Sequence, residues 1–400
     1  MVYITTLSML WLNANYALSQ EHVDEVIHRL DKVGFENIRV KAEGKTLILS
    51  YENTLYSDKS FALSKVLEQI SNCGYDTLKI VTLVNDMPII VSQLKVGNSQ
   101  TDKLGQISTT QNASNFNLSY KTDATWKLLR DELPFNPHFN KIALVLYPQF
   151  YLMNIRLDQI YEVQINIAPA IEASLWRGMK FTGQVILPVF SDNMYGLEGK
   201  KARLGFVTLS QEFHLPHTIF GRFAIGKFNA GRYGADITLK HYLLDEQGYL
   251  KINSGYTGEY LYYDGNWFRN QINTLTWSVG GGYFWRKYNL QLEGSAGRYI
   301  QSDYGLRGDC TRFWGGTSVG LFAMVSSEGS FSGGFHFALP IGPKQRKKYR
   351  IFQLQTPNYF DWEYNTDATT TNGQYYETRP DENRVEHFFN RNLFLKNPVK

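Results

Sequence analysis

Hydrophobic and polar positions alternate with period two along much of the chain, most clearly between residues 233 and 263. Two long runs, 233–244 and 249–263, flank a turn at 245–248 and predict one β-hairpin. In the second run, apolar, aromatic or small residues alternate with mostly polar ones, which is the pattern of a strand with two different faces. Ordinary strands have about 5–6 residues, whereas a tilted strand that crosses a bilayer needs about 9–11. The hairpin is therefore long enough to span a membrane.

The same alternation continues from residue 141 to residue 341 and predicts twelve strands. Tight turns such as 286–288 alternate with longer polar connections such as 191–200, as in outer-membrane barrels with short periplasmic turns. We therefore expect a mainly β fold, a transmembrane antiparallel β-barrel of about 12 to 14 strands. The alternative is a soluble barrel with an aromatic core. The predicted strands cover residues 142–152, 160–175, 180–190, 202–215, 218–228, 233–244, 249–262, 275–287, 289–299, 305–313, 316–325 and 332–341.

The N-terminal part of the chain has a different periodicity. Apolar residues recur at helical spacing after Ser19 and again after Asp58, and two strand-like runs follow each helical run. This helix-strand-strand unit, present twice, predicts a small α+β domain. The strand-like runs are 37–41, 46–51, 77–83 and 88–94.

Four segments follow from these patterns. The apolar run near the start has only about a dozen residues, so it favours a signal peptide over a spanning helix, although a strand or helix of the mature fold is the alternative. Residues 98–125 are rich in Ser, Thr, Gln and Asn and predict a linker. The expected domains are 1–19 as signal peptide, 20–97 as a periplasmic α+β domain, 98–125 as linker and 126–400 as barrel, with 388–395 a candidate last strand.

Composition excludes several classes of protein. Aromatic residues make up 15% of the chain and glycines outnumber prolines by 33 to 12, which suits a curved sheet with interfacial aromatics. The net charge of +4 is too small to predict a surface that binds nucleic acid. Cys73 and Cys310 are far apart in the sequence and predict neither a disulfide scaffold nor a zinc site. We expect no nucleic-acid partner, cofactor or metal.

Three short motifs match catalytic or phosphate-binding patterns, and each lies in a predicted strand or turn. His214 and His217 have HxxH spacing at a turn, without a helix to bring them together. Residues 316–320 match Gly-x-Ser-x-Gly but begin a strand, and 221–227 match a phosphate loop in which Phe228 replaces the magnesium-binding Ser or Thr. We therefore predict no catalytic residue and no enzyme.

Charged residues on neighbouring predicted strands are placed to face the interior of the sheet. One interpretation is that two of the acids form a catalytic pair at the separation found in glycosidases. The simpler prediction is that the acids and bases neutralise one another inside the barrel. The acids are Glu259, Glu293, Asp303 and Asp309, and the bases are Lys251, Arg298, Arg307 and Arg312.

Several motifs resemble those of a known family. Residues 294–305 read Gly-Ser-Ala-Gly-Arg-Tyr-Ile-Gln-Ser-Asp-Tyr-Gly. The N-terminal part adds Gly-Phe-Glu-Asn-Ile-Arg-Val at 34–40, Tyr-Glu-Asn at 51–53 and Asn-Asp-Met-Pro at 85–88. Together they resemble the YjbH family of exopolysaccharide-biosynthesis outer-membrane proteins, over most of residues 21–341.

The resemblance implies an outer-membrane β-barrel with a periplasmic α+β module that assists the secretion or assembly of an exopolysaccharide or capsular polysaccharide. The expected partners are outer-membrane lipid, the polysaccharide chain, and periplasmic or outer-membrane components of a polysaccharide secretion system. Within the shared motif, Arg298, Tyr299, Asp303 and Gly305 are structural or lumenal candidates, and we expect them to shape one hairpin.

Two other functions stay open at this point. A barrel enzyme that modifies lipid or glycan would need a nucleophile such as Ser318 beside a histidine. A barrel that does not conduct could instead be a scaffold of a secretion complex. A wide, polar, unplugged lumen would favour export, whereas a packed lumen would favour the scaffold. The candidate histidines are His214, His217, His241 and His336.

Overall fold

The chain forms two compact units, which divide after His138. This computed structural model describes residues 21–71, 73–96, 116–139, 141–153, 161–192, 199–263, 266–327, 329–347, 352–366, 373–382 and 391. Among these residues, no helix is long and apolar enough to cross a membrane. The small α+β unit and the mainly β large unit both agree with the sequence prediction.

The small unit contains the predicted helix-strand-strand repeat twice. A first helix covers residues 21–33, and Asp58 caps the second helix by accepting hydrogen bonds from the backbone of Ser60 (2.8 Å) and Phe61 (3.2 Å). The sheet order is β1-β2-β3-β4-β5, with β2 and β3 parallel and the other pairs antiparallel. The elements are β1 (Glu36–Glu43), β2 (Thr46–Glu52), α2 (Lys59–Ile70), β3 (Thr77–Val84), β4 (Met87–Lys95), β5 (Phe116–Ser119) and α3 (Asp123–Leu129).

Residues 116–138 belong to the small unit, which corrects the expected linker at 98–125 and the expected barrel start at 126. Strand β5 pairs with β4, and Leu129 of α3 is fully buried in a cluster with Ile48 and Val81 of the sheet. These two elements are too short to show a clear periodicity in a polar stretch. The expected signal peptide at 1–19 and the remainder of the expected linker lie outside the described residues.

A buried ion pair joins β1 to the turn between β3 and β4. The Arg39 guanidinium lies 2.7 and 3.1 Å from the two carboxylate oxygens of Asp86, and both side chains are 1% exposed. Glu52 accepts hydrogen bonds from the backbone N–H groups of Asn85 (2.7 Å) and Asp86 (3.1 Å) and from the amide of Asn37 (2.5 Å). The three N-terminal motifs that carry the family resemblance therefore meet in one buried cluster.

Replacing Arg39 by Met is expected to lower the free energy of unfolding of the small unit by about 3–5 kcal/mol, because the Asp86 carboxylate would stay buried without a cation. Hydrogen exchange of peptides from β1 to β4 in the full chain measures this. The matched control is Lys45→Met, which removes a solvent-exposed ion pair with Asp76 (3.0 Å) and should change the same quantity by less than about 1 kcal/mol. Equal effects of the two substitutions would contradict a structural role for the buried pair.

The large unit is one sheet of 15 strands, and twelve of them coincide with the predicted strands. Neighbouring strands pair antiparallel except β19 and β6, which are parallel. The twelve are β6 (Ile142–Met153), β7 (Glu162–Trp176), β8 (Met179–Ser191), β9 (Arg203–Leu215), β10 (Ile219–Lys227), β11 (Arg232–Leu243), β12 (Gly248–Tyr263), β14 (Thr274–Trp285), β15 (Leu290–Arg298), β16 (Tyr304–Trp314), β17 (Thr317–Ser326) and β18 (Phe331–Pro340). The other three are β13 (Asn266–Arg269), β19 (Phe352–Gln355) and β20 (Tyr359–Asn365).

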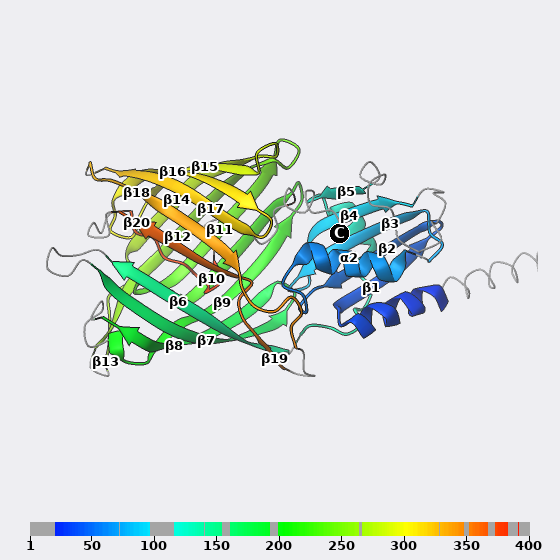
Figure 1. Cartoon of the computed structure of the whole chain (residues 1–400), viewed down its shortest axis with the longest axis horizontal. Helices are drawn as coiled ribbons and strands as arrows, with labels where there is room; N and C mark the ends of the chain where they lie inside the picture. The colour runs from blue at the N-terminus through cyan, green and yellow to red at the C-terminus, as the bar shows by residue number, and fades with distance from the viewer. Residues whose placement is uncertain are drawn as a thin grey trace, which may run out of the picture. The chain divides into compact units, whose positions relative to one another are not determined.

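The large sheet is strongly curved (Figure 1). Its path of strands begins at β19, which pairs with β6, and ends at β20, which pairs with β18. Only residues 356–358 separate β19 from β20 in the chain. The ring of Phe150 on β6 also lies 5.5 Å from the ring of Trp362 on β20. The curvature therefore brings β6 and β20, near the two ends of the path, into side-chain contact.

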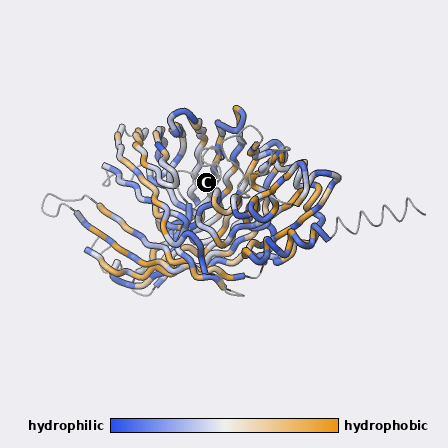
Figure 2. The backbone as a smooth tube through the Cα atoms, turned by 45° about the vertical axis from the view of Figure 1, so that its right-hand side comes forward, coloured by the Kyte–Doolittle hydropathy of each residue, from blue (hydrophilic) through white to orange (hydrophobic). Residues whose placement is uncertain are grey.

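The polarity of this sheet is the reverse of that of a soluble protein. Gln164 and Ser318 are fully buried on the inner face, whereas Ile167 and Leu321 are 40% and 66% exposed on the outer face. Figure 2 shows the same alternation of hydrophilic and hydrophobic residues along the strands. Further buried polar residues of the inner face are Asn166, Thr182, Gln184, Thr208, Asp236, Thr257, Thr276, Gln291, Thr311 and His336. Further exposed apolar residues of the outer face are Ile165, Ile171, Leu187, Phe223, Ile237, Ile252, Leu292, Leu306 and Val325.

Candidate functional site in the polar interior

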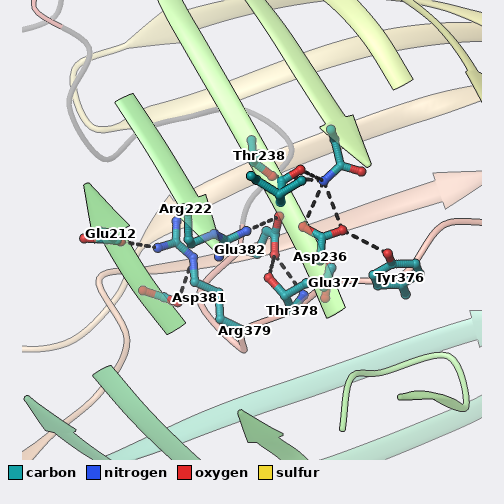
Figure 3. A network of polar contacts seen from close by, with 12 residues as sticks. Glu212, Arg222, Asp236, Thr238, Tyr376, Glu377, Thr378, Arg379, Asp381 and Glu382 are labelled. Carbon is teal, nitrogen blue, oxygen red and sulfur yellow. Dashed lines mark hydrogen bonds and ion pairs between the residues drawn. The ribbon is translucent and has the colours of Figure 1, made fainter. Parts of the chain in front are cut away.

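Residues 373–382, which we call the inner segment, lie against the inner face of the large sheet (Figure 3). The backbone N–H of Gly373 donates to Asp303 (2.7 Å) in the β15–β16 turn, and the carbonyl of Gln374 accepts from Ile300 (3.1 Å) in the same turn. Strand β20 is the last strand among the described residues, and the inner segment, which follows it in the chain, lies across the interior. Of the candidate last strand at 388–395, only residue 391 is among the described residues.

The inner segment runs from one end of the strands toward the other. It begins at the β15–β16 turn and reaches Glu212 and Arg222, which lie near the β9–β10 turn at the opposite end of the sheet. Further along the chain, Arg391 donates to the carbonyl of Asp245 (2.6 Å) and lies 3.2 Å from the carboxylate of Glu246, in the β11–β12 turn at that same end. The inner segment thus extends across the polar interior toward the end of the sheet at which Arg391 lies.

Two ion pairs hold the second half of the inner segment to the wall. The Arg222 guanidinium lies 3.1 Å from the Glu382 carboxylate, and the Arg379 guanidinium lies 3.2 Å from the Glu212 carboxylate. The other Glu382 oxygen accepts hydrogen bonds from the backbone (2.9 Å) and the hydroxyl (3.0 Å) of Thr378. Because charged groups rather than apolar packing make these contacts, they are sensitive to substitution of single charges.

Tyr376 anchors the middle of the inner segment. Its hydroxyl donates to the carboxylate of Asp236 (2.9 Å), and its ring stacks on Phe228 with the centroids 5.3 Å apart. Asn253 also donates to both oxygens of Asp236, at 2.9 and 3.0 Å. A Cβ atom added to Gly255 would lie 1.6 Å from the Tyr376 hydroxyl, so the glycine provides the space that this side chain occupies.

A cavity of about 230 Å³ remains between the inner segment and the strands β11 to β16. Two of the predicted site residues, Arg298 and Tyr299, line it. Arg298 also donates to the carbonyl of Leu275 (2.8 Å), and the backbone N–H of Tyr299 donates to the carbonyl of Asp303 (2.8 Å), which closes the β15–β16 turn.

The other two predicted site residues lie on the same hairpin. Asp303 is buried, and its carboxylate accepts the hydrogen bond from the backbone N–H of Gly373 in the inner segment. At Gly305, an added Cβ would lie 2.8 Å from the carbonyl of Val325 and 2.9 Å from the Tyr299 ring, so this position needs a glycine for close approach. The structure thus brings all four residues to one hairpin, and it adds a contact with the inner segment that the sequence did not indicate.

One of the predicted pairs of inward charges is present, whereas Glu259 pairs with Arg232, and Glu293 and Asp303 accept hydrogen bonds from Tyr249 and Gly373. Arg307 lies 2.7 Å from Asp309 and 2.8 Å from Glu363, and its guanidinium stacks 3.9 Å from the centre of the Phe322 ring. Arg312 is different, because it is on the outer face and lies over the ring of Trp314.

The candidate residues of the enzyme hypothesis lie on several different elements. Ser318 and His336 are both buried on the inner face of neighbouring strands, and Nε2 of His336 lies 3.3 Å from the Thr311 hydroxyl. His214 stacks on Phe220 beside the β9–β10 turn, which contains His217, and His241 is on β11. Within the described part of the chain, no group of three or more His, Cys, Asp or Glu side chains could hold a metal ion.

No family model and no curated protein matches the chain. Among solved structures, the chain is similar to OmpT, an outer membrane protein of Vibrio cholerae. The loop L8 deletion mutant of OmpT is 5% identical, with a TM-score of 0.29, over 49% of this chain and 85% of that chain. OmpT folded in vitro is 6% identical, with a TM-score of 0.25, over 49% of this chain and 79% of that chain. Because these similarities are weak, they say nothing about the chemistry of the interior, which has to be inferred from the residues of this chain.

Proposed function

We propose that the large unit is an outer-membrane β-barrel with a polar interior. The observation that carries this proposal is the reversed polarity of the sheet. A sheet is stable in lipid only when it closes and leaves no unpaired edge. The twelve long strands have 9 to 16 residues, which is enough to span a membrane. Two observations support closure: the rings of Phe150 on β6 and Trp362 on β20 are in contact, and the ends of the path, β19 and β20, are consecutive strands in the chain.

We infer that the small unit is on the periplasmic side. Strand β6, which follows the small unit in the chain, begins at the end of the sheet that carries the short turns at 177–178 and 315–316. The connections at the opposite end include the longer ones at 154–161 and 192–202. In outer-membrane barrels the short turns face the periplasm and the long loops face outward.

Secretion or assembly of an exopolysaccharide is the function that we propose for this barrel, in line with the YjbH resemblance. The resemblance itself carries this part of the proposal, and the structure gives its motifs a place. The barrel motif of that resemblance forms the hairpin that contacts the inner segment, and the N-terminal motifs form the buried cluster of the small unit. The partners would be the polysaccharide chain and other components of its secretion system.

A scaffold that does not conduct is the second candidate function, and the inner segment is the observation that favours it. The segment occupies space that a polysaccharide chain would need, so conduction requires the segment to move. No arrangement among the described residues favours the enzyme alternative in the same way.

Deleting the gene is expected to abolish surface polysaccharide, measured by glycan staining of whole cells, and the wild-type gene should restore it. Unchanged staining would contradict the proposed function.

A variant in which a disulfide fixes the inner segment to the wall distinguishes export from scaffolding. Ile300→Cys with Gln374→Cys places a disulfide beside a backbone hydrogen bond of 3.1 Å, in a background with Cys73→Ser and Cys310→Ser. Export through the barrel predicts that the oxidised variant fails to restore staining and that the reduced one succeeds, whereas a scaffold works in both states.

A further inference from the structure

The cavity beside the inner segment is elongated and has small residues on one wall. Lys251 and Asp236 both line it, and the β11–β12 register places them four residues apart along the strands, or about 13 Å. On the neighbouring strands, Ser278, Gly280 and Ser295 line the same wall. The small side chains leave room for a ligand of one or two ring-sized units.

Aromatic rings with hydroxyl groups face this space. Tyr249, Tyr299 and Tyr376 line the cavity, and the Tyr249 hydroxyl donates to Glu293. A tyrosine combines an apolar ring, which packs against C–H groups, with a hydroxyl that forms hydrogen bonds. Sugar rings present both kinds of surface, so the lining suits a saccharide better than a purely apolar ligand.

Lys251 is the cation of the lining that could donate to a ligand. Arg298 is not counted as a donor of the cavity, because it pairs with Trp277 and Tyr304 of the neighbouring strands, which are exposed on the outer face. Lys251 lines the cavity, and no hydrogen bond or ion pair of its ammonium group is found within the described part of the chain. An ammonium group has three donors and no acceptor, so ligand hydroxyl or ring oxygens would accept hydrogen bonds from Lys251.

The charge of the lining disfavours an acidic ligand. Of the five carboxylates and three cations of the lining, Asp309 is paired with Arg307 and Glu382 with Arg222, which leaves three carboxylates against two cations. A uronate or a sulfated sugar would add negative charge to a site that is already acidic, where like charges repel. The carboxylates are Asp236, Glu293, Asp309, Glu377 and Glu382, and the cations are Lys251, Arg298 and Arg307.

We propose that this cavity binds a saccharide unit, neutral or amine-bearing rather than acidic. The inference rests on the proposed function, because it names the class of polysaccharide that would pass or dock in the interior. The inner segment supplies Tyr376, Glu377 and Glu382 to the site, so a bound sugar would contact the same segment that occupies the lumen.

The test is calorimetric titration of the full-length protein in detergent with three probes: cellotriose, the disaccharide of glucosamine, and trigalacturonate. The wild-type protein should bind cellotriose or the glucosamine disaccharide at least tenfold more tightly than trigalacturonate. Ser295→Trp, which fills the cavity, should weaken binding at least tenfold. The matched control is Ser210→Trp, on the inner face of β9 outside the cavity, and it should leave binding unchanged.

Lys251→Met is a second variant, with a smaller change in volume, and should weaken binding severalfold. Tighter binding of trigalacturonate would overturn the proposed site. So would the absence of sugar binding by folded protein, where a change of gel mobility on heating shows that the protein is folded. Loss of surface polysaccharide in the deletion strain without sugar binding would overturn the site and leave the proposed function intact. Sugar binding with unchanged surface polysaccharide in the deletion strain would overturn the function and leave the site.

Discussion

Removal of residues 367–400 is expected to open the interior of the proposed barrel. This truncation deletes the inner segment and leaves β20 complete. The full-length protein should conduct weakly in planar bilayers, and the truncated protein should conduct at least about tenfold more, since a barrel of this size has an interior that its own side chains do not fill. Cells that carry the truncated form should also become sensitive to large antibiotics that the outer membrane normally excludes.

Single charge changes provide the graded control for this experiment. Arg222→Gln and Arg379→Gln each remove one ion pair between the inner segment and the wall. Each variant should open briefly, with a mean conductance between those of the full-length and truncated proteins. Equal conductance of the full-length and truncated proteins would contradict occlusion by the inner segment. Weak conductance of both would mean that the wall of the barrel itself closes the interior.

Val279→Arg is expected to destabilise the large unit by about 2–4 kcal/mol, the value for an arginine that faces lipid near the middle of the bilayer. Val279 lies at the centre of β14, on the outer face, and is 48% exposed. In a soluble protein the same change at an exposed site would be close to neutral. Urea-induced unfolding of the protein in lipid vesicles measures the difference.

The neighbouring residue is the matched control. Ser278 precedes Val279 on the same strand but faces the interior cavity, so Ser278→Arg introduces the same side chain into a polar environment. It should be tolerated far better than Val279→Arg. The opposite order, with the outer-face substitution harmless and the inner one disruptive, would contradict the membrane assignment.

The sequence predicts the regular part of this fold well because long strands repeat a simple code. On β17, alternate residues from Ser318 are buried, while Val319, Leu321 and Val325 are exposed, so ten residues carry one consistent signal. The two helix-strand-strand repeats are equally clear, since Asp58 marks the start of α2 and the residues Asn85 and Asp86 mark the turn after β3.

Short elements and the tail were less predictable. Strand β5 and helix α3 have 4 and 7 residues, which is too few to establish a period. Strand β20 does alternate, with Phe360, Trp362 and Tyr364 between polar residues, but it lies between the twelve predicted strands, which end at residue 341, and the candidate last strand at 388–395. The sequence contained this signal in a segment that otherwise looks like an irregular tail.

The inner segment could not be predicted from local pattern. Its residues are polar and irregular, and its partners are remote: Glu382 pairs with Arg222, 160 positions away, and Tyr376 with Asp236, 140 positions away. The β15–β16 hairpin, which carries the predicted site residues, could be predicted in part. The motif pointed to Asp303, but its contact with Gly373 depends on a chain reversal after β20 that no spacing in the sequence encodes.

The central claim is that the large unit is a closed barrel in the outer membrane, and heat-modifiability tests it most directly. Inner and outer membranes are separated, and each fraction is run on a semi-native gel with and without boiling. A detergent-resistant barrel migrates differently before and after unfolding by heat. Our account predicts a band in the outer-membrane fraction that shifts on boiling. A protein found in the soluble fraction, with the same mobility before and after boiling, would contradict it.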